Sequence, residues 1–129
     1  MSMMDWNEYR KQLAGAVGTI TKLNPDMVAG YRAMSGAGKQ VGGLGDKMRE
    51  LIALSAAISL RCDGCIAVHT AAALKAGATE AEIAETLGVA ISINAGAAMV
   101  YSARAMDAVA EYQAHKAGTA QGGKAQGAE

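Results

Sequence analysis

The sequence predicts an all-α fold of five or six helices in a protein that assembles into a homo-oligomer. Alanine is abundant, runs of β-branched residues are absent, and the 129 residues include a single proline. This composition favours helices over strands. Apolar residues make up 51% of the chain and charged residues 19%, which excludes a disordered protein. In so short a chain, this apolar surplus indicates that contacts between subunits bury part of it.

Two helices are predicted in the N-terminal part of the chain. The first covers residues 5–23, where apolar side chains fall roughly on one helical face: Trp6, Leu13, Val17 and Ile20. Asn24 and Pro25 then predict the start of a second helix, with Asn24 as N-cap and Pro25 at the first helical position. We expect this helix to end in the glycine-containing segment 35–38.

The next two helices follow a glycine-rich loop at residues 42–45. Asp46 is expected to cap the third helix, which continues through Leu60. The fourth helix is expected to begin at Cys62 and to end at Gly77, a residue suited to the C′ position that closes many helices.

The C-terminal part opens with a capping box. The Thr79 hydroxyl can accept from the Glu82 backbone while the Glu82 carboxylate reaches back, which predicts a short helix to about Leu87. A long apolar helix then extends to about His115. Residues 117–129 lack core-forming side chains and are expected to form a flexible tail. The sequence therefore predicts one domain over residues 1–116, followed by this tail.

Charge and hydropathy exclude several classes of partner. The formal net charge is zero, so no basic footprint for nucleic acid is present. The uncharged stretch at residues 87–103 is short for a membrane span and contains polar residues, which favours a helix buried in an oligomer over membrane insertion. The N-terminal residues lack the pattern of a signal peptide, so we expect a cytoplasmic protein. In that reducing compartment, two cysteines favour catalysis or metal binding over a structural disulfide.

The two cysteines form the most informative motif of the chain, Cys62-Asp-Gly-Cys65. At the start of a helix, residues three apart share a face, so the two thiols can close a disulfide with little backbone movement. The helix N-terminus favours thiolate over thiol, and the thiolate is the form that attacks disulfides. His69 lies one turn beyond Cys65 and can accept its proton. These residues predict a redox site.

Glu50 is the candidate carboxylate to orient His69. It precedes an apolar run in the third helix, so it is either a surface residue of the first turn or a buried functional group. Two other interpretations of the motif compete with the redox site. Cys-x2-Cys-x3-His supplies three ligands for a metal, although zinc sites usually use four. The cysteines could also be small apolar core residues, but their segment is polar.

The arrangement of Glu50, eleven intervening residues, Cys62-x-x-Cys65, three further residues and His69 resembles that of the AhpD-like alkylhydroperoxidases. These proteins belong to the carboxymuconolactone decarboxylase superfamily, and the resemblance covers about residues 24–110. The chain departs from the best-known pattern at Gly64, where that pattern has a histidine. This change removes one member of the proton relay of the family.

The resemblance implies a helical fold that assembles as a hexamer, with a trimer as the alternative. It implies that Cys65 attacks a hydroperoxide, that Cys62 resolves the sulfenic acid as a Cys62–Cys65 disulfide, and that His69, backed by Glu50, moves the proton. No tightly bound cofactor is expected. An external dithiol reductant, either a lipoyl-bearing or a thioredoxin-like protein, would reset the disulfide.

Two functions of other classes remain open at this point. One is a decarboxylase or isomerase of a small organic acid or lactone, which would need a group such as Arg49 or Arg104 to hold a carboxylate; the decarboxylases of the superfamily generally lack the cysteine pair. The other is a non-catalytic oligomer whose thiols sense the redox state.

Overall fold

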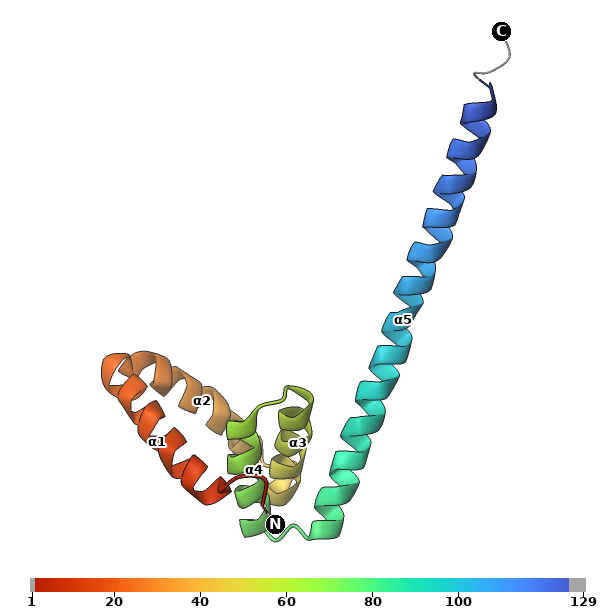
Figure 1. The fold of residues 1–129 in the computed structure, drawn as a ribbon. Helices are drawn as coiled ribbons and strands as arrows, with labels where there is room; N and C mark the ends of the chain where they lie inside the picture. Colours follow the sequence, from red (N-terminus) through yellow and green to blue (C-terminus); the bar gives the residue numbers. More distant parts are fainter. Residues whose placement is uncertain (1, 126–129) are drawn as a thin grey trace. The chain divides into compact units, whose positions relative to one another are not determined.

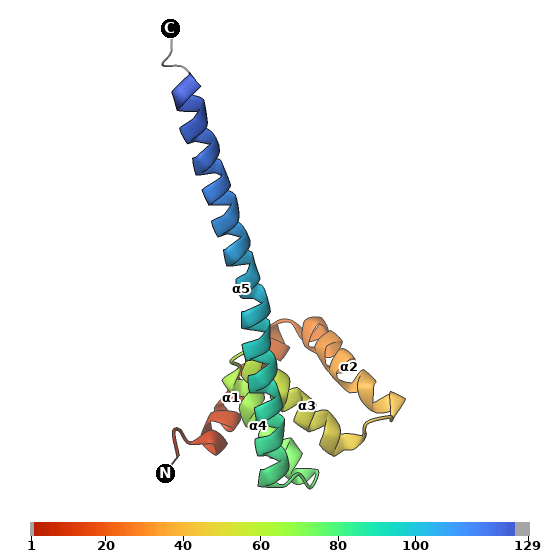
Figure 2. The ribbon, with the colours of Figure 1, turned by 90° about the vertical axis from the view of Figure 1, so that its right-hand side faces the viewer.

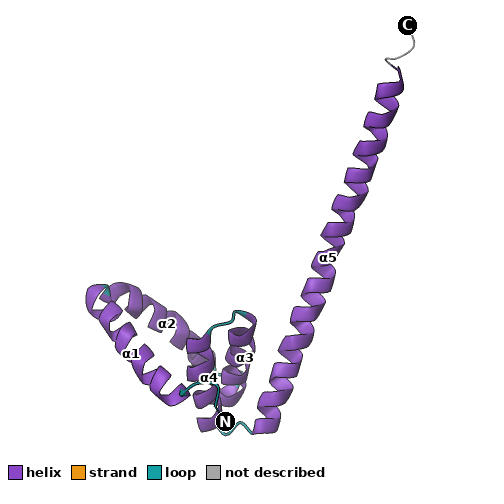
Figure 3. Cartoon of the chain, in the orientation of Figure 1, coloured by secondary structure: helices purple, strands orange, loops and turns teal. Residues whose placement is uncertain are grey.

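The predicted all-α class is confirmed. The computed structural model describes the backbone of residues 2–125 and the side chains of residues 2–120, and this part of the chain contains five helices and no strand (Figure 3). The chain divides into two units, Met1–Ile91 and Ser92–Glu129. The first unit holds α1 (Trp6–Leu23), α2 (Pro25–Val41), α3 (Gly45–Ser59), α4 (Asp63–Lys75) and the beginning of α5 (Glu80–Ala125), as Figure 1 shows.

In the first unit, α3 and α4 lie side by side, and α1 contacts both α4 and α2 (Figures 1 and 2). Much of the core at these contacts is alanine, including Ala57, Ala67 and Ala73, which are at most 7% exposed. Leu51 of α3 packs with Ala73, Ala78 and Ile83 where α3, α4 and the start of α5 meet. Small side chains let the helix backbones approach closely, so residues on α3 can reach residues on α4.

Several helix boundaries follow the capping chemistry of the sequence. Asn24 is the N-cap of α2, where its Oδ1 accepts from the Met27 N–H, and Pro25 is the first helical residue. Gly77 follows the C-cap of α4 with φ 90°, a left-handed conformation that costs glycine little. The expected roles of these three residues are confirmed.

Two predicted boundaries are wrong. The second helix does not end at residues 35–38 but continues through Val41 and stops at Gly42, whose φ is 75°. Helical glycines each cost only about 1 kcal/mol, whereas a left-handed residue ends the backbone pattern. Asp46 does not cap α3, which begins at Gly45 without a side-chain cap. Asp46 instead lies in the first turn and pairs with Arg49 at 3.3 Å.

The two helices predicted after residue 79 form one continuous helix, α5. Gly88 does not break it, because an isolated glycine without proline weakens a helix but does not end it. The helical backbone also includes residues 117–125 of the segment predicted to be a flexible tail. Residues 126–129 lie outside the described part, and the extent of the single domain stays a prediction.

Apolar side chains of α5 are exposed along the second unit. Ile93, Met99, Val100, Tyr101 and Met106 are each 66–74% exposed. By length and composition, the segment Glu80–Ala120 could also cross a membrane: its most apolar window has a mean hydropathy of 1.5, and 6% of that window is buried. An apolar helix with so little burial needs a partner that covers it.

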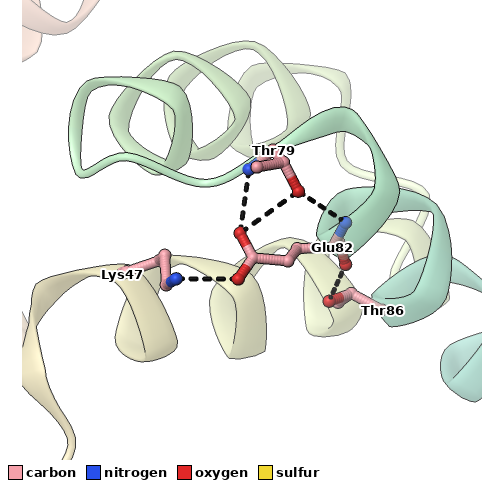
Figure 4. A network of polar contacts seen from close by, with 4 residues as sticks. All are labelled: Lys47, Thr79, Glu82 and Thr86. Atoms are coloured by element: carbon pink, nitrogen blue, oxygen red, sulfur yellow. Dashed lines mark hydrogen bonds and ion pairs between the residues drawn. The ribbon is translucent and has the colours of Figure 1, made fainter.

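A polar network connects α3 to the start of α5 (Figure 4). Glu82 Oε1 accepts from Lys47 Nζ at 2.7 Å, and Glu82 Oε2 accepts from the Thr79 N–H at 2.9 Å. The Glu82 N–H in turn donates to Thr79 Oγ1 at 3.1 Å, which confirms the predicted capping box. The Lys47 hydrogen bond, followed by that of the Thr79 backbone, holds the pKa of Glu82 below its ordinary range.

We expect this network to make the protein less stable in acid. A carboxylate with a lowered folded pKa stabilises the fold fully above its unfolded pKa, about 4.3, and this contribution is lost as the pH falls through the folded value. The measurement is urea unfolding between about pH 6 and about pH 3, the range in which carboxyl groups titrate. As the pH falls, the free energy of unfolding should decrease less for Glu82→Gln than for the parent. Glu85→Gln, which changes an exposed carboxylate on the same helix, is the control. Equal losses in Glu82→Gln and the parent would contradict the assignment.

Candidate active site

The end of α3 fixes the position of Cys62. The Arg61 N–H donates to the Ile58 carbonyl at 3.2 Å, and the Cys62 N–H donates to the Ala57 carbonyl at 3.0 Å. This pair of bonds is a Schellman motif. Arg61 occupies its left-handed position with φ 54°, where glycine is usual. Cys62 follows Arg61 directly. Its N–H therefore closes the end of α3, and the same residue is the N-cap of α4.

The two cysteines are joined as a disulfide at the start of α4. Their Cα atoms lie 5.2 Å apart, within the ordinary range for a disulfide. The Cys65 backbone N–H donates to Cys62 Sγ at 3.2 Å, so Cys62 caps the helix through its sulfur. After reduction, this N–H and the positive end of the helix dipole favour a thiolate at Cys62.

Glu50 and His69 meet across the contact between α3 and α4. The Glu50 Oε2 and His69 Nδ1 atoms are 2.7 Å apart, and the two side chains are 19% and 31% exposed. Glu50 is thus a half-buried partner of His69 rather than a free surface residue. An ionised carboxylate can only accept, so Nδ1 carries the hydrogen and donates it. In the neutral ring, Nε2 is then left as the basic nitrogen.

The sulfurs and the imidazole share an open cleft of about 410 Å³. Cys62, Cys65 and His69 are among its lining residues. The other lining residues come from α1, α2 and α4, and most are apolar: Leu13, Val17, Tyr31, Gly64 and Val68. The sequence motif identified the reactive groups but not the apolar residues that line the cleft. The only sign of these residues in the sequence was the expected apolar face of the first helix, which includes Leu13 and Val17.

The arrangement can support thiol chemistry with proton transfer. Glu50 holds the ring of His69, and His69 lies one turn beyond Cys65 on α4 beside the same cleft. Over the described residues, no group of three or more His, Cys, Asp or Glu side chains is placed to hold a metal ion. The metal-site interpretation therefore gains no support from the placement of Cys62, Cys65 and His69.

Comparison with known proteins identifies the family. The model of the carboxymuconolactone decarboxylase family matches residues 25–108. The chain belongs to this family. A crystal structure of an apo carboxymuconolactone decarboxylase family protein from Legionella pneumophila is similar, with a TM-score of 0.66 and 31% identity over 83% of this chain and 96% of that chain.

Two curated relatives also match. An uncharacterized protein of Haemophilus influenzae is 43% identical over 104 residues, which are 81% of this chain and 92% of the relative. An uncharacterized protein of Cupriavidus necator is 30% identical over 89 residues, which are 69% of this chain and 79% of the relative. The match to the carboxymuconolactone decarboxylase family therefore covers most of the folded chain, and the matched range contains Glu50, both cysteines and His69.

We expect Glu50→Gln to slow the reaction of the reduced cysteines with iodoacetamide at neutral pH by at least about tenfold. The amide can still accept a hydrogen bond from Nδ1, but it lacks the charge that stabilises a protonated imidazole. The measurement is the alkylation rate as a function of pH. Glu85→Gln serves as the control for an exposed carboxylate. A Glu50→Gln profile identical to that of the parent would mean that Glu50 has no influence on the thiols.

Proposed function

We propose that this chain is a thiol-dependent peroxidase that reduces hydroperoxides through Cys65 and Cys62. The observation that carries the proposal is that the disulfide-bonded pair and a histidine held by Glu50 line one cleft. A cleft of about 410 Å³ is of the size that binds small molecules. A disulfide at a helix N-terminus beside a candidate base fits a catalytic pair better than a structural cross-link.

In the first step, His69 takes the proton of the Cys65 thiol, and the resulting thiolate attacks the terminal oxygen of the hydroperoxide. A sulfur–oxygen bond forms as the oxygen–oxygen bond breaks, and the electron pair of that bond leaves on the alkoxide. The proton held by His69 converts the alkoxide to an alcohol. Cys65 is now a sulfenic acid. Because Gly64 replaces the histidine of the best-known pattern, His69 and Glu50 carry this proton transfer without it.

In the second step, the Cys62 thiolate attacks the sulfenic sulfur of Cys65. The disulfide forms as the sulfur–oxygen bond breaks, and the leaving hydroxide becomes water by taking up the proton that the Cys62 thiol lost. The hydrogen bond from the Cys65 N–H to Cys62 Sγ supports this role, because it favours the thiolate form of the resolving cysteine.

An external dithiol completes the cycle by thiol–disulfide exchange. Its first thiolate attacks Cys65 and releases the Cys62 thiolate; its second thiol then displaces Cys65 and closes the disulfide of the reductant. In sum, a hydroperoxide and a dithiol give an alcohol, water and a disulfide. We propose a lipoyl-bearing or thioredoxin-like protein as this reductant, in the cytoplasm, where such thiols are kept reduced. The cycle needs no tightly bound cofactor.

The decarboxylase alternative needs a group such as Arg49 or Arg104 to hold a carboxylate. Arg49 is engaged by Asp46 and by the Gly38 carbonyl, at 3.3 and 3.1 Å. Arg104 stacks on Tyr101, 4.8 Å from the ring centroid. Arg49 does not line the cysteine cleft. A carboxylate substrate in that cleft would therefore lack Arg49 as a cationic partner.

Peroxide consumption tests the proposal. Reduced parent protein with excess dithiothreitol should consume cumene hydroperoxide catalytically, whereas Cys65→Ser should fall to the rate of dithiothreitol alone, because the attacking sulfur is lost. Once dithiothreitol has been removed and hydroperoxide added, Cys62→Ser should retain the first step and accumulate a sulfenic acid at Cys65, detectable by dimedone labelling.

Two outcomes would refute the peroxidase. In one, Cys65→Ser turns over hydroperoxide as fast as the parent. In the other, the parent is oxidised once, changes its assembly and shows no turnover, which is the behaviour of a redox sensor.

We also propose that α5 packs against other copies of this chain, in a hexamer or else a trimer. The exposed apolar side chains of α5, such as Ile93, Val100 and Met106, are the support. Polar residues within the same helix, such as Ser92 and Asn94, suit a protein partner better than lipid.

Light scattering coupled to size-exclusion chromatography measures the assembly. The parent should elute as an oligomer, and Val100→Asp should lower the mass, because a carboxylate would be buried in the interface. Glu111→Gln, at an exposed and already polar position of α5, is the control. A monomeric parent, or a parent recovered only with membranes, would contradict the proposed assembly.

A further inference from the structure

Leu13 of α1 packs directly on Gly64, the residue that precedes Cys65. A Cβ atom built on Gly64 would lie 2.8 Å from Leu13 Cδ2, and the three side-chain atoms nearest to it all belong to Leu13. That separation is shorter than carbon atoms tolerate. The Leu13 side chain therefore occupies the space that a side chain at position 64 would fill, and this places it beside the cysteine pair.

Leu13 also lines two clefts of the first unit. It lines the cysteine cleft of about 410 Å³ and a neighbouring cleft of about 290 Å³. Val17 and Val68 are the other residues that line both clefts. These three apolar side chains are common to both clefts, and the atoms nearest to a Cβ at Gly64 belong to Leu13.

The two clefts differ in the charge of their lining residues. Arg10 and Arg32 line the neighbouring cleft, whereas the residues lining the cysteine cleft include no lysine or arginine. A guanidinium attracts anions and is always charged. An opening between the clefts would therefore give anions a favourable route toward the cysteines.

We propose that Leu13 is a specificity-determining residue, which keeps the cysteine cleft apolar and separate from Arg10 and Arg32. It would thus favour neutral molecules over anionic ones at the sulfur of Cys65. This inference rests on the proposed function in one respect: for a peroxidase, the selected substrates are uncharged organic hydroperoxides rather than hydroperoxides that carry a carboxylate.

Alkylation of the reduced protein tests the proposal. The two reagents, neutral iodoacetamide and anionic iodoacetate, are nearly equal in size and differ in charge. The measured quantity is the iodoacetate rate divided by the iodoacetamide rate, relative to the same ratio for glutathione. Leu13→Ala should raise this relative ratio by at least about threefold, the scale of a solvent-exposed charge interaction. A general loosening of the site would raise both rates together and leave the ratio unchanged.

Lys11→Ala, at an exposed position two residues away on α1, is the matched control and should leave the ratio at the parent value. Gly64→Ala provides an independent variant, because its Cβ must displace Leu13; it should shift the ratio in the same direction. The same glycine substitution should have little further effect when Leu13 is already alanine.

The arginines provide the decisive arm. Arg10→Gln with Arg32→Gln should return the ratio of Leu13→Ala toward the parent value, and should change the ratio much less when Leu13 is present. An unchanged ratio in both Leu13→Ala and Gly64→Ala, or a raised ratio that persists without the two arginines, would overturn the proposal. These rates do not depend on peroxide turnover, so a shifted ratio in a protein without peroxidase activity would refute the proposed function alone.

Discussion

The close packing of α3 on α4 is the constraint on which the candidate site depends. Ala57 and Ala73 are 2% and 0% exposed, and side chains of this size let the two helix axes approach. The approach brings Glu50 Oε2 to 2.7 Å from His69 Nδ1. Larger side chains along this contact would separate the carboxylate from the imidazole, so the alanine-rich composition that predicts the fold class also sets the geometry of the site.

The sequence predicts features whose cause is local. Asn24, Gly77 and the pair Thr79–Glu82 act through hydrogen bonds or backbone angles within a few residues, and the structure places each of them as expected. The disulfide spacing of Cys62 and Cys65 is local in the same sense. Helix ends without such a signal were harder to place: α2 passes three glycines before Gly42 ends it.

Features that need two helices could not be predicted from the pattern. The position of Glu50 was equally consistent with a surface residue and a functional one, and only the contact with α4 distinguishes them. The same holds for Leu13. Helical periodicity predicted that its side chain lies on an apolar face, but could not predict that this face packs against Gly64. The catalytic roles of Cys62, Cys65, His69 and Glu50 stay predictions, because positions alone do not measure a reaction.

The backbone around the cysteines has a consequence for conformational entropy. Cys62 is held by the hydrogen bonds that close α3 and by its place at the start of α4, so its position does not rely on the disulfide. The cross-link joins residues three apart, and the restriction of an unfolded chain by a disulfide grows with the length of the loop it closes. Forming this bond therefore removes little conformational freedom from the unfolded chain, and breaking it restores little, so the stability of the fold depends only weakly on whether the two cysteines are joined.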